Sequence, residues 1–153
     1  MDTKKAIDDI VENLFYALPV IHKRLMKIEP PRIKCGIRLS RQHFGILAVV
    51  HEKACPISEV AATFLISKPR MTLLVNQMEK AGLIKRSGCP DDRRITNIAL
   101  TPKGKNVFRY CDEYVKSNVR DILADLTEKE LEELNESLKI LREIGPRFDG
   151  QGS

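Results

Sequence analysis

The fold is decided by residues 66–86, which read ISKPRMTLLVNQMEKAGLIKR. Methionine, leucine and valine recur in this stretch at positions 71, 74, 75 and 78, which is the spacing of one helix face. Ser67 is a favoured N-cap residue, and Gly82 suits the left-handed position that ends a helix. The pattern therefore predicts a short helix between Ser67 and Gly82 that buries its apolar face.

Upstream of this helix, two further helices are expected. Residues 57–65 fit a short helix, and residues 64–67 form a turn of the length that joins the two helices of a helix-turn-helix. Before it, Ser40 is an N-cap candidate, with Leu39 placed to pack on Phe44.

Downstream, the period of the pattern changes from helical to alternating. Residues 83–87 and 94–100 are predicted strands, and the polar turn 88–93 between them makes a hairpin with a charged tip. Thr101 followed by Pro102 then opens a long helix, because proline is tolerated at the first helical position.

The two ends of the chain carry leucine-rich and isoleucine-rich helix faces. A heptad-like face follows Ile7, Val11, Leu14, Leu18, Ile21, Leu25 and Ile28. Pro19 interrupts it, so we expect a kink there or a break into two helices. The last helix starts at a Thr127–Glu130 capping box and carries Leu131, Leu134, Leu138 and Leu141. These faces are either intramolecular core or dimer contacts, and their place at both ends favours dimerisation through Ile7, Val11, Leu14 and the four leucines.

The expected fold is mainly α with a small two-stranded β-wing: a winged helix-turn-helix with N- and C-terminal dimerisation helices. The expected divisions are a dimerisation helix over residues 1–35, a winged helix-turn-helix lobe over 36–105, dimerisation helices over 106–146 and a flexible tail over 147–153.

Charge is concentrated in the middle of the chain. The net charge of the whole chain is +5. Residues 68–105 hold nine basic and three acidic side chains, a net charge of +6, whereas residues 121–143 hold eight acidic and three basic ones, a net charge of −5. A basic central segment predicts an anionic partner for that segment. Aromatic residues make up only 5% of the chain and Trp is absent, which argues against a stacking platform for single-stranded nucleic acid.

Other classes of function have little support in the sequence. The four cysteines are widely spaced and form no metal-binding pattern, so we expect reduced thiols, no metal and no cofactor. No nucleophile–base pair or phosphate-binding glycine loop indicates an enzyme. The charged first residues and the absence of a long apolar run predict a cytoplasmic protein without a membrane partner.

Four motifs lie within residues 40–105: residues 57–61, Ile66-Ser67-Lys68 with Thr72, residues 78–84, and, most specifically, Asp92-Arg93-Arg94 followed by residues 98–104. By these motifs, residues 40–105 resemble the MarR family of transcriptional regulators. Pro69, in the first turn of the helix, departs from the small or polar residues usual in the family. The resemblance implies a homodimer that binds double-stranded DNA at a pseudo-palindromic operator, most often as a repressor.

In such a lobe, the helix after Ser67 presents its exposed side to the major groove. Arg70 fits guanine and either Asn76 or Gln77 fits adenine, while Pro69 and Leu73 suit thymine methyl groups. Arg93 and Arg94 would enter or flank the minor groove, and the resemblance implies that Asp92 holds one of these arginines in place. The expected DNA-contacting residues are Ser67, Lys68, Pro69, Arg70, Thr72, Leu73, Asn76, Gln77, Arg86, Asp92, Arg93 and Arg94.

The resemblance also implies a small aromatic or phenolic effector between the dimer helices and the lobe. Its expected pocket residues are Leu18, His22, Leu25, Phe44, Leu47 and His51, which fit equally well as ordinary core. Two alternatives stay open at this point: a redox-responsive regulator acting through Cys89 or Cys35, and a winged-helix module that binds an acidic protein.

Overall fold

The computed structural model describes residues 2–148. In chain order its elements are α1 (Thr3–Leu25), α2 (Arg41–Val50), β1 (Cys55–Pro56), α3 (Ile57–Thr63), α4 (Lys68–Lys80), β2 (Ile84–Gly88), β3 (Thr96–Leu100), α5 (Pro102–Leu123), α6 (Glu128–Ile144) and a 3₁₀ turn (Gly145–Arg147). The chain divides into two compact units, which meet within α5 between Lys116 and Ser117. Most of the expected tail, residues 149–153, lies outside the described residues.

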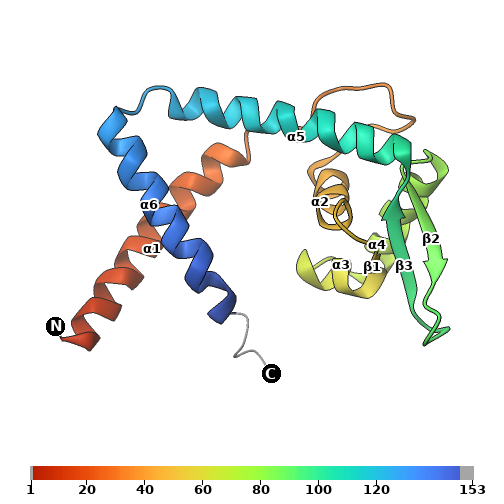
Figure 1. The fold of residues 1–153 in the computed structure, drawn as a ribbon, viewed down its shortest axis with the longest axis horizontal. Helices are drawn as coiled ribbons and strands as arrows, with labels where there is room; N and C mark the ends of the chain where they lie inside the picture. Colours follow the sequence, from red (N-terminus) through yellow and green to blue (C-terminus); the bar gives the residue numbers. More distant parts are fainter. Residues whose placement is uncertain (1, 149–153) are drawn as a thin grey trace. The chain divides into compact units, whose positions relative to one another are not determined.

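The first unit contains the expected winged helix-turn-helix lobe. Figure 1 shows α2, α3, α4 and the three strands gathered beside the N-terminal half of α5. The turn between α3 and α4 passes through Leu65, which has a φ of 52°. This left-handed conformation is uncommon for a residue with a side chain, and it reverses the chain between the two helices.

Within the described residues, the predicted hairpin is part of a three-stranded sheet. Its order is β1-β3-β2, and both pairings are antiparallel. Ile84 pairs with Leu100 in the expected hairpin, and Cys55 pairs with Ile98 on the other side of β3. The expected two-stranded wing is thereby confirmed as the β2–β3 hairpin, and the two-residue β1, which is too short to show alternation in the sequence, adds a third strand.

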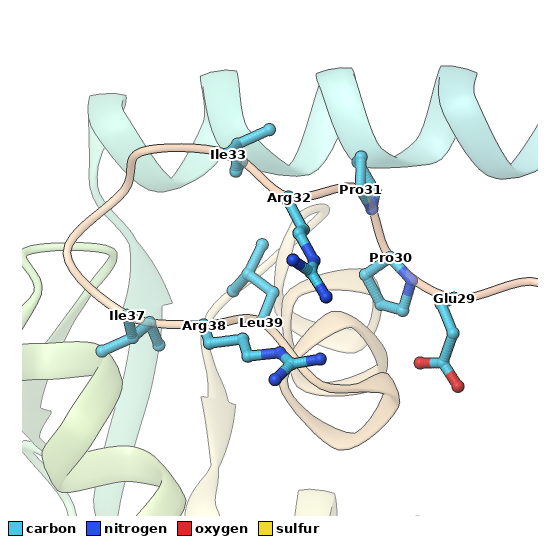
Figure 2. A pocket seen from close by; sticks show the side chains of 8 residues that line it. All are labelled: Glu29, Pro30, Pro31, Arg32, Ile33, Ile37, Arg38 and Leu39. Carbon is cyan, nitrogen blue, oxygen red and sulfur yellow. The ribbon is translucent and has the colours of Figure 1, made fainter.

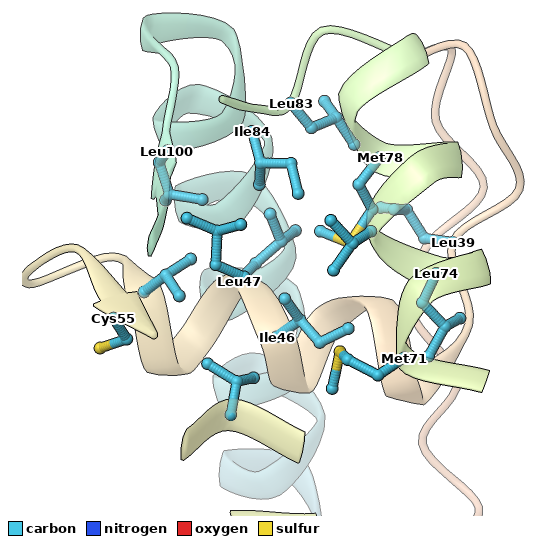
Figure 3. Packing of buried hydrophobic residues seen from close by; sticks show 14 of the residues in the cluster. Leu39, Ile46, Leu47, Cys55, Met71, Leu74, Met78, Leu83, Ile84 and Leu100 are labelled. Carbon is cyan, nitrogen blue, oxygen red and sulfur yellow. The ribbon is translucent and has the colours of Figure 1, made fainter. Parts of the chain in front are cut away.

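A single apolar cluster holds the lobe together, as Figure 3 shows. Ile46 and Leu47 of α2 lie at its centre, fully buried. The predicted face of α4 closes one side, and Leu83, Ile84 and Leu100 close another. Burying side chains of this size stabilises each by about 1.5–3 kcal/mol, so this cluster fixes which face of α4 remains outside.

Capping interactions set the limits of these helices largely as expected. Ser40 caps α2, and the side chain at the third helical position that completes its capping box is His43. At the end of α4, Gly82 has a φ of 72°, and Leu83 N–H donates to the Met78 carbonyl, a Schellman ending. Ser67 occupies the N-cap position of α4 without a side-chain hydrogen bond.

The helices at the two ends bury no residue of their own. α1 runs through Pro19 as one helix, so the expected break into two helices does not occur. A proline removes only one N–H donor from a helix, and the remaining bonds of a 23-residue helix carry it past that point. α6 starts at the predicted Thr127–Glu130 capping box. No residue of α1 or α6 is buried.

Candidate nucleic-acid interface

The outer face of α4 is exposed and mostly polar. Its buried side is the Met71, Leu74, Val75 and Met78 stripe, each at most 1% exposed. The residues expected to read DNA from this element are all exposed, namely Ser67, Lys68, Pro69, Arg70, Thr72, Leu73, Asn76 and Gln77. The burial of one face thus leaves a surface with hydrogen-bonding groups on the other.

The wing tip carries two exposed arginines. Asp92 accepts a hydrogen bond from the backbone N–H of Arg94 at 2.9 Å, and the Arg94 Nε lies 3.5 Å from the same carboxylate oxygen. The Arg94 side chain is nonetheless 93% exposed. Within residues 2–148, the Arg93 side chain has no ion-pair or hydrogen-bond partner. The tip therefore offers one oriented and one unpaired guanidinium.

A hollow of about 510 Å³ separates α4 from the wing. Ile57, Ala61, Ile66 and Met71 form its apolar walls. Lys68 and Thr72 line it from α4, and Arg94 lines it from the wing. Basic groups from two elements thus border the same concave surface, which a convex polyanion would fit.

Arg86, which is expected to contact DNA, is already engaged by side chains of α4. It is half-buried on β2, and its guanidinium donates to Glu79 and, at 2.6 Å, to the side-chain carbonyl of Asn76. Arg86 is therefore paired with Glu79 and also holds the side chain of Asn76. The sequence analysis did not find Glu79, because the contact joins a helix to a strand across the end of α4.

Two residues of α2, which the sequence analysis also missed, contact α4. The side-chain carbonyl of Gln42 accepts from Arg70 Nε at 3.1 Å and from Arg70 Nη2 at 2.8 Å. His43 Nε2 lies 3.2 Å from Gln77 Oε1. His43 is only 6% exposed, and its burial lowers the pKa of the imidazole, to which the nearby Arg70 cation also contributes. The residues in these contacts are 28 and 34 positions apart in the sequence, so no local sequence pattern predicts them.

The six residues expected to form an effector pocket have different surroundings. Leu18 and His22 line an apolar hollow on α1 with Leu14, Phe15 and Pro19, and Leu25 is exposed. Leu47 is fully buried core. Phe44 and His51 both stack on Phe108, with ring centroids 5.9 and 4.4 Å apart. His51 also borders a hollow of about 260 Å³ with Lys105, Phe108, Arg109 and Asp112.

A further hollow, of about 450 Å³, lies in the segment between α1 and α2. Figure 2 shows the side chains of Arg32 and Arg38 projecting into it, with Pro30, Pro31 and Leu39 around them. On its border, Glu29 is paired with Arg41 at 2.7 Å. None of the residues expected to bind DNA or an effector lines this hollow.

The cysteines give little support to chemistry at this surface. Cys35, Cys55 and Cys111 are buried free thiols, and Cys89 is half-buried in the wing. Burial is the main cause that raises the pKa of the Cys111 thiol to about 11, and the neighbouring Cys35 adds to it. Across the described part of the chain, no three histidine, cysteine or acidic side chains lie together as a metal site, and no helix is both long and apolar enough to cross a membrane.

Comparison with known proteins agrees with this geometry. Residues 39–95 match the sequence description of the MarR family. HTH-type transcriptional regulator PecS of Dickeya dadantii is 33% identical over 98 residues, which cover 61% of this chain and 58% of PecS. The matched region thus spans little more than half the length of that relative.

Solved structures extend the likeness to the fold. A probable transcriptional regulator from Pseudomonas aeruginosa superimposes with a TM-score of 0.55 at 27% identity, over 70% of this chain and 81% of that one. Streptococcus pneumoniae FabT, solved in complex with DNA, superimposes with a TM-score of 0.60 at 21% identity, over 95% of this chain and 99% of FabT.

The lobe, its exposed α4 face and its charged hairpin define a winged helix-turn-helix protein. Within that class, the match over residues 39–95 and the likeness to PecS show that this part of the chain is similar to regulators of the MarR family. The resemblance stated from the sequence is thereby confirmed.

Proposed function

We propose that this chain is a homodimeric transcriptional regulator that binds a pseudo-palindromic double-stranded DNA operator and acts as a repressor. The observation that carries the proposal is the outward polar face of α4, with Arg70, Asn76 and Gln77 exposed, beside the exposed Arg93 and Arg94 of the wing. A helix of this kind enters the major groove, where the edges of the bases differ in their donors and acceptors. The wing arginines reach the adjacent backbone or minor groove.

Dimerisation is supported by apolar surface that one chain leaves uncovered. On α1, Ile7, Val11 and Leu14 are 55, 43 and 42% exposed. On α6, Leu138 and Leu141 are 54 and 48% exposed. Apolar faces of this extent usually contact a partner, and a second copy of the chain provides the same faces. Such a dimer would read two half-sites about 34 Å apart.

The DNA-binding part is tested with the full chain on random-sequence duplexes and on the DNA upstream of its own gene. Selection should enrich one sequence with two-fold symmetry, and affinity should fall steeply as salt is added, since bound lysines and arginines release counterions. Arg94→Ala should weaken binding and lower the log–log salt slope by about 1. Lys129→Ala removes the same charge from α6 and should change neither. Binding without any sequence preference would contradict the proposal and favour a protein-interaction module.

Dimerisation is tested by sedimentation equilibrium on the wild type and on a Leu14→Glu variant. The wild type should sediment as a dimer, and the variant should dissociate at low concentration while its thermal melting still shows a folded lobe. A monomeric wild type at micromolar concentration would refute this part of the proposal.

We further propose that a small aromatic effector relieves DNA binding, and the aromatic cluster of Phe44, His51 and Phe108 supports this. Beside it, Lys105 and Arg109 border the hollow of about 260 Å³ and favour an aromatic anion, while Asp112, the acidic residue of that lining, pairs with Lys116. Benzoate serves as the probe. It should lower DNA affinity because it binds the DNA-free protein more tightly than the DNA-bound protein, and Arg109→Ala should reduce that effect. Equal DNA affinity with and without benzoate and salicylate would exclude this class of effector at this site.

A further inference from the structure

The hydrogen bonds behind α4 determine which groups its outer face can offer. Gln42 lies in the first turn of α2, half-buried, and its carbonyl oxygen accepts from both Nε and Nη2 of Arg70. These two donors form one side of the guanidinium fork. The other side, formed by Nη1 and the second hydrogen of Nη2, points away from Gln42 and remains available.

His43 fixes the orientation of Gln77 in a similar way. The Ser40 backbone N–H donates to His43 Nδ1 at 3.0 Å, so Nδ1 is an acceptor and the proton of the neutral ring lies on Nε2. His43 Nε2–H then donates to the atom it faces on Gln77, which has to be the carbonyl oxygen, 3.2 Å away. The amide NH₂ of Gln77 is therefore the part directed away from the imidazole.

Asn76 is held by a third contact of the same kind. A guanidinium only donates, so the Asn76 atom that faces Arg86 Nη2 at 2.6 Å is its carbonyl oxygen. Arg86 is fixed in turn by Glu79. Asn76 thus also keeps its NH₂ group for outside partners.

We propose that Gln42 and His43 are positioning residues that direct hydrogen-bond donors of Arg70 and Gln77 outward, as Arg86 does for Asn76, so that these three side chains present donors to the DNA. This inference rests on the proposed function. In the major groove the acceptors are guanine O6 and N7, adenine N7 and thymine O4. The half-site should therefore present guanine to Arg70 and acceptor atoms to the two amides. Bidentate recognition of adenine needs an amide oxygen as well as an NH₂ group, and it is disfavoured here because each amide oxygen is turned toward a protein donor that occupies one of its two lone pairs.

The first test concerns Gln42. A sequence is selected with the wild-type chain, each base pair is then exchanged singly, and Arg70→Ala identifies the pair that Arg70 reads. Gln42→Met keeps the size of the side chain but removes the acceptor, and should lower discrimination at that pair about tenfold, while affinity for bulk DNA stays within about twofold. Gln42→Glu still accepts from the fork and should restore the discrimination.

The second test concerns the direction of the Gln77 amide. His43→Glu retains a Ser-x-x-Glu capping box but cannot donate, so Gln77 should rotate and present its oxygen. The preference at the pair read by Gln77, identified with Gln77→Ala, should then move from acceptor-bearing edges toward cytosine and adenine amino groups. Because His43→Glu places a carboxylate in a buried site, Gln77→Glu serves as a second variant: it keeps an oxygen toward His43 and should shift the preference in the same direction.

The outcomes separate this inference from the proposed function. If the wild type selects no sequence, the proposed function fails. If it selects one, but Gln42→Met and Gln77→Glu leave every base preference within about twofold, the function stands and the positioning role is overturned. The positioning role is also overturned if the wild type prefers adenine at the base pair read by Asn76 or Gln77 and this preference depends on the adenine amino group.

Discussion

Gly104 lies in the first turn of α5, where the helix backbone passes directly over the start of the wing. Thr101 N–H donates to the Leu83 carbonyl at 3.0 Å, and Thr101 Oγ1 donates to the Gly82 carbonyl at 2.6 Å. A Cβ atom added at Gly104 would lie 2.9 Å from the Leu83 carbonyl carbon and closer still to its oxygen. Because the obstacle is backbone, Gly104→Ala requires α5 to move away from residues 82–83.

The cost of that movement follows from the contacts that it breaks. The two Thr101 hydrogen bonds are worth about 1 kcal/mol each, and overpacking strain adds about 1–3 kcal/mol. Alanine favours the helix over glycine by about 1 kcal/mol, which offsets part of the loss. The expected net destabilisation is about 3 kcal/mol, a large share of the roughly 5–15 kcal/mol by which domains are stable.

Urea unfolding followed by circular dichroism measures this loss. With an m-value of about 2 kcal/mol per molar, the midpoint of Gly104→Ala should fall by about 1.5 M. Gly88→Ala is the matched control, since no atom lies within 4 Å of the added Cβ, and its midpoint should stay within about 0.3 M of the wild type. A Gly104→Ala midpoint equal to that of the control would refute the close approach of α5 to the wing.

Three further outcomes are expected. Leu65→Gly should stabilise the protein by about 1 kcal/mol in urea unfolding, because φ is 52° and the side chain, 94% exposed, loses no packing. Met71→Ala should cost about 2–5 kcal/mol, whereas Leu73→Ala, on the exposed face of the same helix, should cost under about 1 kcal/mol. Burial holds the pKa of His43 below its ordinary 6.5, so the unfolded chain takes up the proton first. The free energy of unfolding should therefore have its full value above about pH 6.5 and should decrease below that pH by at most about 1.4 kcal/mol per pH unit. In His43→Gln this decrease should be smaller.

The sequence predicts those parts of the fold that depend on neighbours along the chain. The α4 stripe was visible because a 3.6-residue period needs only one helix to express it, and Gly82 and Ser40 carry their capping roles locally. The residues of α4 that do not belong to this stripe lie on its exposed face, which is why the residues expected to read DNA from α4 are all exposed.

The parts that depend on contacts between distant segments could not be predicted. β1 is a strand only because Cys55 pairs with Ile98, and two residues carry no period of their own. Gln42 looks like any exposed residue in a first helical turn until α4 is placed against it. Arg86 was assigned to DNA because it is basic and on the wing, yet the position of Glu79 decides what its charge does.

The same contacts between distant segments divide the residues on the outer face of α4 into those with a hydrogen-bond partner behind the helix and those without one. Replacing Arg70, Asn76 or Gln77 leaves a polar partner behind α4 without its hydrogen bond, and for the buried His43 that loss costs about 1–3 kcal/mol. Pro69 and Leu73 have no such partner among the described residues, so a new side chain there alters only what faces outward. New base preferences should therefore arise at positions 69 and 73 with little change in stability. Changes at position 77 that remove the acceptor facing His43 should lower stability unless position 43 changes with them.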